Sequence, residues 1–334
     1  MKKIPLPVSY GINIALMAAF LLIGNRMLSS GALSRAQSSV LLQIGIYIIL
    51  AVSLNVSTGY LGQLPLGHAG FMAVGAYAGA IFWKSGLLPD GAPSIVAGLI
   101  VAGLTASVFG VAIGIPALRL RGDYLAIITL GFGEIIRVAL INLPHITGGI
   151  SGLKAIPKYS TFTLVYTCAM LTCAVIHMMM NSRHGRAILA IRENEIAAES
   201  CGINTTYYKV LAFAVSAFFA GIAGALYAGN QGIITPGGFD FMASINILVI
   251  VVLGGMGSMT GSVIAAAVIT ALPLALQGFN NYRMIVYPIL LIIVMIYRPS
   301  GLMGTHEFSL TALLEKSAGG ANRAAGSKPG GEAK

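Results

Sequence analysis

The stretch that decides the fold is Ala36–Trp83, AQSSVLLQIGIYIILAVSLNVSTGYLGQLPLGHAGFMAVGAYAGAIFW, which contains no Asp, Glu, Lys or Arg. A membrane-spanning helix needs about 20 mostly apolar residues, so this one stretch is long enough for two spans. A second uncharged stretch of similar length covers 241–282, and shorter ones cover 91–118, 159–182 and 210–239. These long apolar runs lack the period-two alternation of barrel strands, and they predict spanning helices.

The composition excludes a soluble domain. Hydrophobic residues make up 57% of the chain and charged residues 9%, whereas a soluble protein carries about 25% charged residues. Further candidate spans at 10–24, 124–143 and 284–297 bring the total to about ten, with eight to ten as the range. The sequence therefore predicts an all-α, polytopic integral membrane bundle over residues 1–302, followed by a disordered cytoplasmic tail over 303–334.

The distribution of basic residues predicts the orientation. With ten spans, roughly twice as many Lys and Arg fall on one side as on the other, and the richer side is expected to be cytoplasmic. Both termini are then cytoplasmic, and the net charge of +10 reflects this bias rather than nucleic-acid binding. The start, Met1-Lys2-Lys3 before an apolar run, fits either a cleaved signal peptide or an uncleaved first helix; the many later spans favour the second.

Small residues recur about every four positions in three of the expected spans, which is the pattern of closely packed membrane helices. The three stripes are Gly75 and Gly79; Gly98, Ala102, Ala106, Gly110 and Gly114; and Ala217, Gly221, Ala225 and Gly229. They predict a tight bundle and do not identify a substrate.

Two glycine-rich stretches interrupt the helical pattern, at 58–68 and at 253–261. Irregular backbone at membrane depth is tolerated where it is buried or lines a cavity, and helix N-termini there attract a carboxylate. The alternative is that both are ordinary turns at the inner surface. The substrate-pathway candidates from these stretches and from the span after Asp123 are Thr58, Gly59, Gly62, Gly67, Thr129, Gly131, Gly255 and Gly257.

One expected span carries two charges, Glu134 and Arg137, at positions i and i+3. This spacing puts both side chains on one helix face, with the acid N-terminal to the base, and it favours an intrahelical ion pair. A structural role is the favoured interpretation, and direct contact with substrate is the alternative.

The inner loop at about 182–207 is the one sizeable charged segment in the middle of the chain. Asn194 is a good N-cap, and Glu195 follows it in the first turn, where the helix dipole favours an acid. Gly202 is suited to the left-handed position after the helix. The sequence predicts a short capped helix that can dock into another protein, and a capped connecting loop is the alternative. The expected contact residues are Arg186, Arg192, Glu193, Asn194, Glu195, Ala197, Ala198 and Gly202.

Several chemical signatures are absent from the sequence. There is no GxxxxGK[ST] phosphate loop, no arrangement typical of a catalytic site, and no cluster with metal-ligand spacing. The chain is therefore not expected to be an enzyme, to bind a metal or to carry a cofactor. Energy for uphill transport has to come from a partner or from an ion gradient.

Five segments in order resemble the branched-chain amino acid ABC transporter permeases of the LivM type. They are LNVSTGYLGQLPLGHAGFMAVGAYAGA from Leu54, LRLRGDYLAIITLGFGEIIR from Leu118, the loop 185–209, LAFAVSAFFAGIAGALYA from Leu211 and VLGGMGSMTGSVIAA from Val252. The resemblance covers roughly residues 43–302. It implies a subunit of a bacterial cytoplasmic-membrane importer, with a second LivH-like permease, two ATPases that bind ATP and Mg, and a periplasmic or lipid-anchored binding protein.

The resemblance also assigns the inner loop to ATPase coupling, where importers carry the pattern E-A-A-x-x-x-G. Ala197, Ala198 and Gly202 match that pattern, while Ile196 occupies the acid position and Glu195 precedes it. The cargo implied is leucine, isoleucine, valine or a similar apolar amino acid. Urea and short-chain amide permeases look similar and stay open as alternatives, as does an ion-coupled secondary transporter.

Overall fold

The computed structural model describes residues 19–27, 34–275 apart from 90, 119 and 121, and residues 292, 296–297 and 301–304. Within these residues the fold is all-α, and the pairing of extended segments is limited to one isolated bridge between Leu153 and Ile234. Most of the first expected span, nearly all of the last one and the tail from 305 onward lie outside the described residues.

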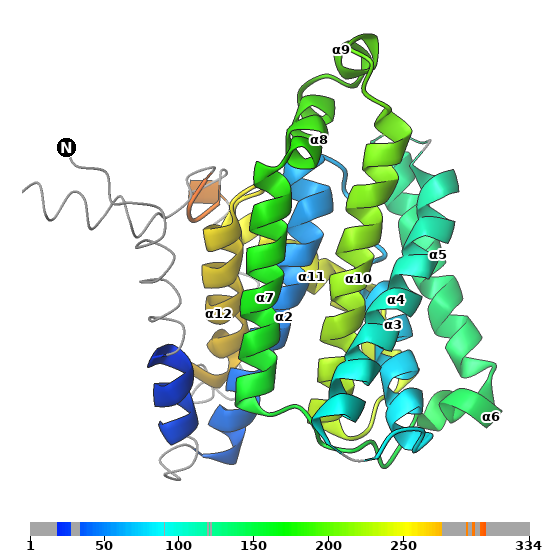
Figure 1. The fold of residues 1–334 in the computed structure, drawn as a ribbon, viewed down its shortest axis with the longest axis vertical. Helices are drawn as coiled ribbons and strands as arrows, with labels where there is room; N and C mark the ends of the chain where they lie inside the picture. Colours follow the sequence, from blue (N-terminus) through cyan, green and yellow to red (C-terminus); the bar gives the residue numbers. More distant parts are fainter. Residues whose placement is uncertain are drawn as a thin grey trace, which may run out of the picture.

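The helices follow one another along the chain with short connections (Figure 1). Their bounds are α2 Arg35–Asn55, α3 His68–Lys84, α4 Ala92–Ala117, α5 Asp123–Ile141, α6 Pro144–Thr147, α7 Phe162–Asn181, α8 Arg183–Glu193, α9 Glu195–Ser200, α10 Thr205–Gln231, α11 Phe241–Gly254 and α12 Met259–Ala275. A π-helical turn, η1 (Val56–Tyr60), extends α2, and two 3₁₀ turns, η2 (Gly149–Ser151) and η3 (Pro236–Phe239), lie in connections.

Five helices in the described ranges are long and apolar enough to cross a membrane: α2 with η1, α4, α5, α7 and α10. α3, α11 and α12 are shorter, with 17, 14 and 17 residues. The all-α bundle is confirmed, while the count of eight to ten spans and the cytoplasmic termini stay predictions.

α10 lies at the centre of the bundle, and the three small-residue stripes meet along it. A Cβ added to Gly75 would overlap the backbone of Gly221, and one added to Gly221 would overlap the carbonyl of Ala102 in α4. A Cβ added to Gly110 would likewise overlap the methyl group of Ala217. The stripes therefore let the backbones of α3, α4 and α10 approach closely, as their spacing predicts.

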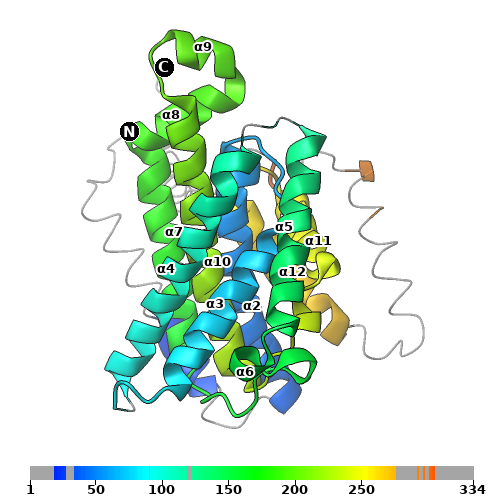
Figure 2. The same cartoon turned by 90° about the vertical axis from the view of Figure 1, so that its right-hand side faces the viewer.

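The two ends of the bundle differ. α8 and α9 project beyond one end, and α6 lies at the opposite end in both views (Figures 1 and 2). Leu302 donates its N–H to the carbonyl of Leu253 at 2.7 Å, next to the C-terminus of α11. That C-terminus lies at the α8 end, since Gly257 just beyond it packs on Gly59 and Arg192. We call the α8 end the inner end, following the orientation predicted from the basic residues.

Two helices, α3 and α11, begin inside the bundle instead of at its ends. His68, the first residue of α3, is 3.1 Å from the hydroxyl of Ser53 in α2, whose carbonyl accepts from Ser216 in the middle of α10. α11 begins at the same level, because Ser244 accepts the N–H of Ala69 at 3.1 Å. The two helices therefore start close together at mid-depth and run toward opposite ends.

Candidate functional site

The segment 61–67 descends from η1 into the bundle and leads into α3. The N–H of Leu66 donates to the hydroxyl of Thr129 in α5 at 3.0 Å. Gly67 packs so closely on the backbone of Thr129 that a Cβ there would overlap it. The end of the first glycine-rich stretch is thus irregular backbone packed inside the bundle, and it brings two predicted pathway residues, Gly67 and Thr129, into contact.

The segment 232–240 enters from the outer end in the same way and leads into α11. Asp240 caps this helix, because its carboxylate accepts the N–H of Ala243 at 2.9 Å. The sequence pattern did not indicate this second broken helix, and Asp240 was given no role beyond separating the uncharged runs 210–239 and 241–282. The available signal was Pro236-Gly237-Gly238 followed by an N-capping residue, which is a typical start of a helix.

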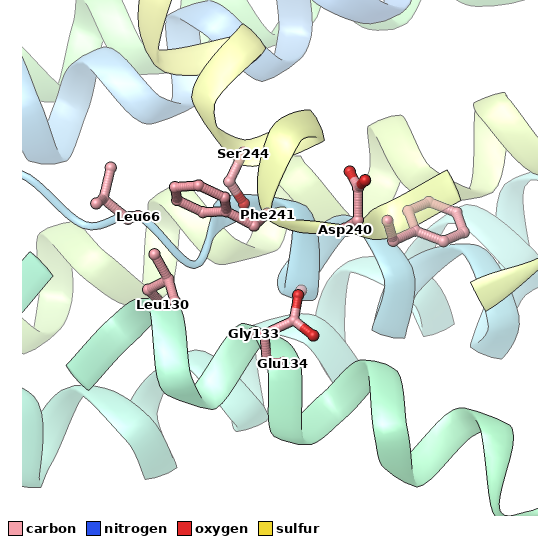
Figure 3. A pocket seen from close by; sticks show the side chains of 9 residues that line it. Leu66, Leu130, Gly133, Glu134, Asp240, Phe241 and Ser244 are labelled. Carbon is pink, nitrogen blue, oxygen red and sulfur yellow. The ribbon is translucent and has the colours of Figure 1, made fainter. Parts of the chain in front are cut away.

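The N-termini of α3 and α11 meet beside a small cavity (Figure 3). Leu130, Gly133 and Glu134 of α5 line one side of it. Asp240, Phe241 and Ser244 line another. We call this place the crossing. Helix N-termini carry partial positive charge, and here they are met by polar groups of this chain: the Asp240 carboxylate caps α11, and the Ser244 hydroxyl accepts the N–H of Ala69 in α3.

The predicted pair of Glu134 and Arg137 is confirmed. The Nε of Arg137 lies 2.7 Å from the carboxylate of Glu134, and both side chains are about one-third exposed. Because the carboxylate also borders the crossing, the pair holds one acid of the cavity lining in place. The structural role and the contact with substrate are therefore compatible.

The second glycine-rich stretch forms the turn between α11 and α12 at the inner end. There Gly257 packs directly on Gly59. A Cβ on Gly59 would overlap the backbone of Gly257, so the contact requires glycine at position 59. Gly255, with φ 108°, ends α11 and is packed closely by Gly301. For this stretch the alternative interpretation, a turn at the inner surface, describes the backbone correctly.

The other pathway candidates lie in different surroundings. Thr58 is buried, and its hydroxyl donates to the carbonyl of Leu54 in its own helix. Gly62 packs on the side chain of Arg192 at the inner end. Gly131 has no atom within 4 Å of the position its Cβ would take, so it lies apart from the other candidates. Apart from Gly131, the candidates therefore form two groups: Gly67 and Thr129 lie beside the crossing without lining its cavity, and the others lie at the inner end.

The caps predicted for the inner loop are confirmed. Asn194 accepts the N–H of Ala197 at 3.0 Å, which starts α9. Gly202 has φ 83° and donates to Glu199, while Ile203 donates to the carbonyl of Ala198. These two bonds form a Schellman motif that ends the helix. α8 is amphipathic and buries Ile188 and Ile191 against the bundle, so the loop is a rigid helical hairpin.

Three predicted contact residues of the hairpin also contact other parts of this chain. Ala198 is 5% exposed, so it lies on the buried side of α9. Glu195 forms an ion pair with Lys209 of α10 at 2.7 Å, and Arg192 turns toward Gly59. For a helix as short as α9, the sequence pattern could not show which face contacts the bundle and which faces outward. The outward side carries Ile196, which is 67% exposed, together with exposed Ala197, Arg186, Glu193 and Asn194.

The pair of Glu195 and Lys209 leads to a prediction about the hairpin. The Lys209 side chain is 5% exposed, so the change Glu195→Gln leaves its charge buried without a counter-ion, at about 1–3 kcal/mol. We expect faster amide hydrogen exchange across α9 in this variant. The matched control is Glu199→Gln on the exposed side of the same helix. Equal exchange in the two variants would contradict an anchoring role for the pair.

A helical bundle with two broken helices meeting at mid-depth and a rigid hairpin at one end defines the class of multi-pass membrane transport proteins. Residues 37–295 match the family described as the branched-chain amino acid transport system, permease component. This chain belongs to that family, and its members are transport components rather than enzymes.

Curated relatives agree with this assignment. The chain is 38% identical to the high-affinity branched-chain amino acid transport system permease protein LivM of Salmonella typhimurium, over 81% of this chain and 70% of the relative. It is 39% identical to LivM of Escherichia coli, over 77% and 68%. The permease LivH of Salmonella typhimurium is 26% identical, over 78% and 92%. No solved structure matches this chain.

Proposed function

We propose that this chain is the membrane-spanning permease subunit of an ATP-driven importer that carries leucine, isoleucine, valine or similar apolar amino acids across the bacterial cytoplasmic membrane. The observation that carries the transport role is the crossing, where two helix N-termini and the carboxylates of Glu134 and Asp240 meet inside the bundle. The cargo follows from the names of the LivM relatives.

The proposed assembly contains a second, homologous permease of the LivH kind, two cytoplasmic ATPase subunits and a substrate-binding protein outside the membrane. ATP and Mg bind to the ATPase subunits, and no nucleic acid takes part. The hairpin of α8 and α9 within the loop 182–207 docks on an ATPase. This role is supported by its projection beyond the bundle, by its two caps and by the apolar side chain of Ile196 at its exposed surface.

The cargo is tested with the purified complex and its own binding protein in lipid vesicles. We expect uptake of labelled leucine, isoleucine and valine that requires ATP on the side of the hairpin, and no uptake of urea or acetamide. An apolar side chain on a zwitterion suits a bundle interior with few charges, whereas urea needs more hydrogen-bonding groups. Uptake of urea without uptake of leucine would refute the proposed cargo.

An ion-coupled carrier is the second candidate function, and Asp240 is the observation that favours it. Carriers of that kind place carboxylates at mid-depth, and the structure puts Asp240 there beside Glu134. The two functions differ in their energy source. Uptake that survives proton and sodium ionophores but stops without ATP supports the importer; the reverse pattern supports the carrier.

A further inference from the structure

Arg192, the penultimate residue of α8, connects the hairpin to the membrane-spanning part of the chain. Its Nη1 donates to the carbonyl of Gly59 at 2.9 Å. Its Nη2 lies 2.8 Å from the carboxylate of Glu193, which fixes the other edge of the guanidinium. One side chain therefore joins the hairpin to the backbone of η1.

The position of Gly59 near the end of η1 explains why its carbonyl accepts a hydrogen bond from a side chain. η1 is π-helical, with the N–H of Leu61 donating to the carbonyl of Val56, and the helix ends there. Carbonyls in the last turn of a helix lie beyond its ladder of N–H donors and take partners from elsewhere.

η1 and Asn55, the residue before it, are also fastened to the turn between α11 and α12. The Asn55 side chain accepts the N–H of Gly257 at 2.9 Å and donates to the carbonyl of Ser258 at 3.1 Å. Gly59 lies directly on Gly257, with no space for a side chain between them. Displacement of η1 is therefore passed on to the C-terminal end of α11.

The same side chain also rests on the segment that leads into α3. A Cβ on Gly62 would lie 2.8 Å from the Cγ of Arg192, so the arginine stem packs on this glycine. Five residues later, Gly67 ends the segment against Thr129 at the crossing. Arg192 thus touches the chain leading to α3 and, through Gly59, the chain leaving α11. The pair of Glu195 and Lys209, in contrast, fastens α9 to α10.

We propose that Arg192 is the positioning residue that transmits movement of the α8–α9 hairpin to both broken helices, and so to the crossing. The inference rests on the proposed importer function and adds the path by which ATP-driven movement reaches the substrate. A planar guanidinium suits this task, since it donates along two edges at once and holds Gly59 and Glu193 in a fixed relation. An ammonium group provides no such fork.

The test compares Arg192→Met and Arg192→Lys with Arg183→Gln, a change of an exposed arginine at the start of the same helix. Uptake of leucine per ATP hydrolysed is measured in vesicles, and retention of the ATPases is measured in detergent. We expect Arg192→Met to keep the ATPases and hydrolyse ATP but to lower uptake per ATP roughly tenfold, the effect of one lost charge-assisted hydrogen bond. Arg192→Lys restores part of this ratio, and Arg183→Gln leaves it unchanged.

A second measurement does not depend on transport. Amide hydrogen exchange of residues 59–67 and 255–258 is expected to rise in Arg192→Met and to stay unchanged in Arg183→Gln. If the Arg192→Met variant does not accumulate, the Glu193→Gln variant is used in its place. The Glu193 side chain is 73% exposed, and removing its charge frees only one edge of the Arg192 guanidinium. A smaller fall in uptake per ATP is then expected.

The outcomes separate the inference from the proposed function. Wild-type uptake that ignores ATP refutes the importer function. ATP-driven wild-type uptake, together with a normal ratio of uptake to hydrolysis and unchanged exchange in Arg192→Met, refutes the transmission role. A fall in the ratio together with loss of the ATPases assigns Arg192 to docking and also overturns the inference.

Discussion

Replacing Gly221 by Val is expected to abolish accumulation of folded protein in the membrane. A Cβ at this position would overlap the carbonyl of Ala102 and crowd the methyl group of Ala106. Gly75 of α3 also packs closely on the backbone of Gly221. Backbone atoms cannot rotate aside as a flexible side chain does, so α3, α4 and α10 would have to separate. Overpacking of this kind destabilises by about 3 kcal/mol or more.

The measurement is the yield of monodisperse protein in mild detergent and its midpoint of thermal unfolding. Gly237→Ala is the control, because nothing lies within 4 Å of the Cβ position of Gly237 in η3. It is expected to match the unchanged protein in both quantities. Similar yields and midpoints for Gly221→Val and Gly237→Ala would show that α10 does not need this close approach.

The second large effect is expected from Ile196→Arg, which should abolish transport while leaving a folded bundle. Ile196 is the large apolar side chain on the outward side of α9, and it is 67% exposed in the isolated subunit. If the hairpin docks on an ATPase, this side chain becomes buried there. A charged guanidinium in its place would lose at least about 2 kcal/mol of binding, a factor of roughly 30 in affinity.

Co-purification of the ATPases in detergent and leucine uptake in vesicles measure this effect together. Ile196→Val, which keeps an apolar side chain, serves as the control and should retain both activities. Ala198→Trp is a poor probe, because Ala198 packs inside this chain and the ring would disturb α9 itself. Normal ATPase retention by Ile196→Arg would place the docking surface elsewhere.

Features set by neighbouring residues were predictable from the sequence. The caps at Asn194 and Gly202 and the pair of Glu134 and Arg137 depend on spacings of three to eight positions within one helix. The small-residue stripes were predictable as well, because the helical period alone places Gly75 and Gly221 on packing faces.

Features that depend on depth or direction were not predictable in the same way. The sequence does not show that Asp240 caps a helix inside the bundle, because only the fold shows that segment 232–240 turns back into it. Ala198 is small enough for either face of α9, and only the packing of the hairpin decides which. Arg192 looks like a solvated loop residue, because its partner, the carbonyl of Gly59, is 133 positions away in sequence.

The position of α11 late in the sequence has a consequence for synthesis of the chain. Ala69 and Ser244, which join the starts of the two broken helices, are 175 positions apart in sequence. At 5–20 residues per second, a ribosome takes roughly 10–35 s to pass from one to the other. Throughout that interval the N–H of Ala69 lies without its native acceptor in a setting that penalises unpaired backbone groups. The N–H of Ala69 therefore depends on another acceptor, such as water, until Ser244 has been synthesised.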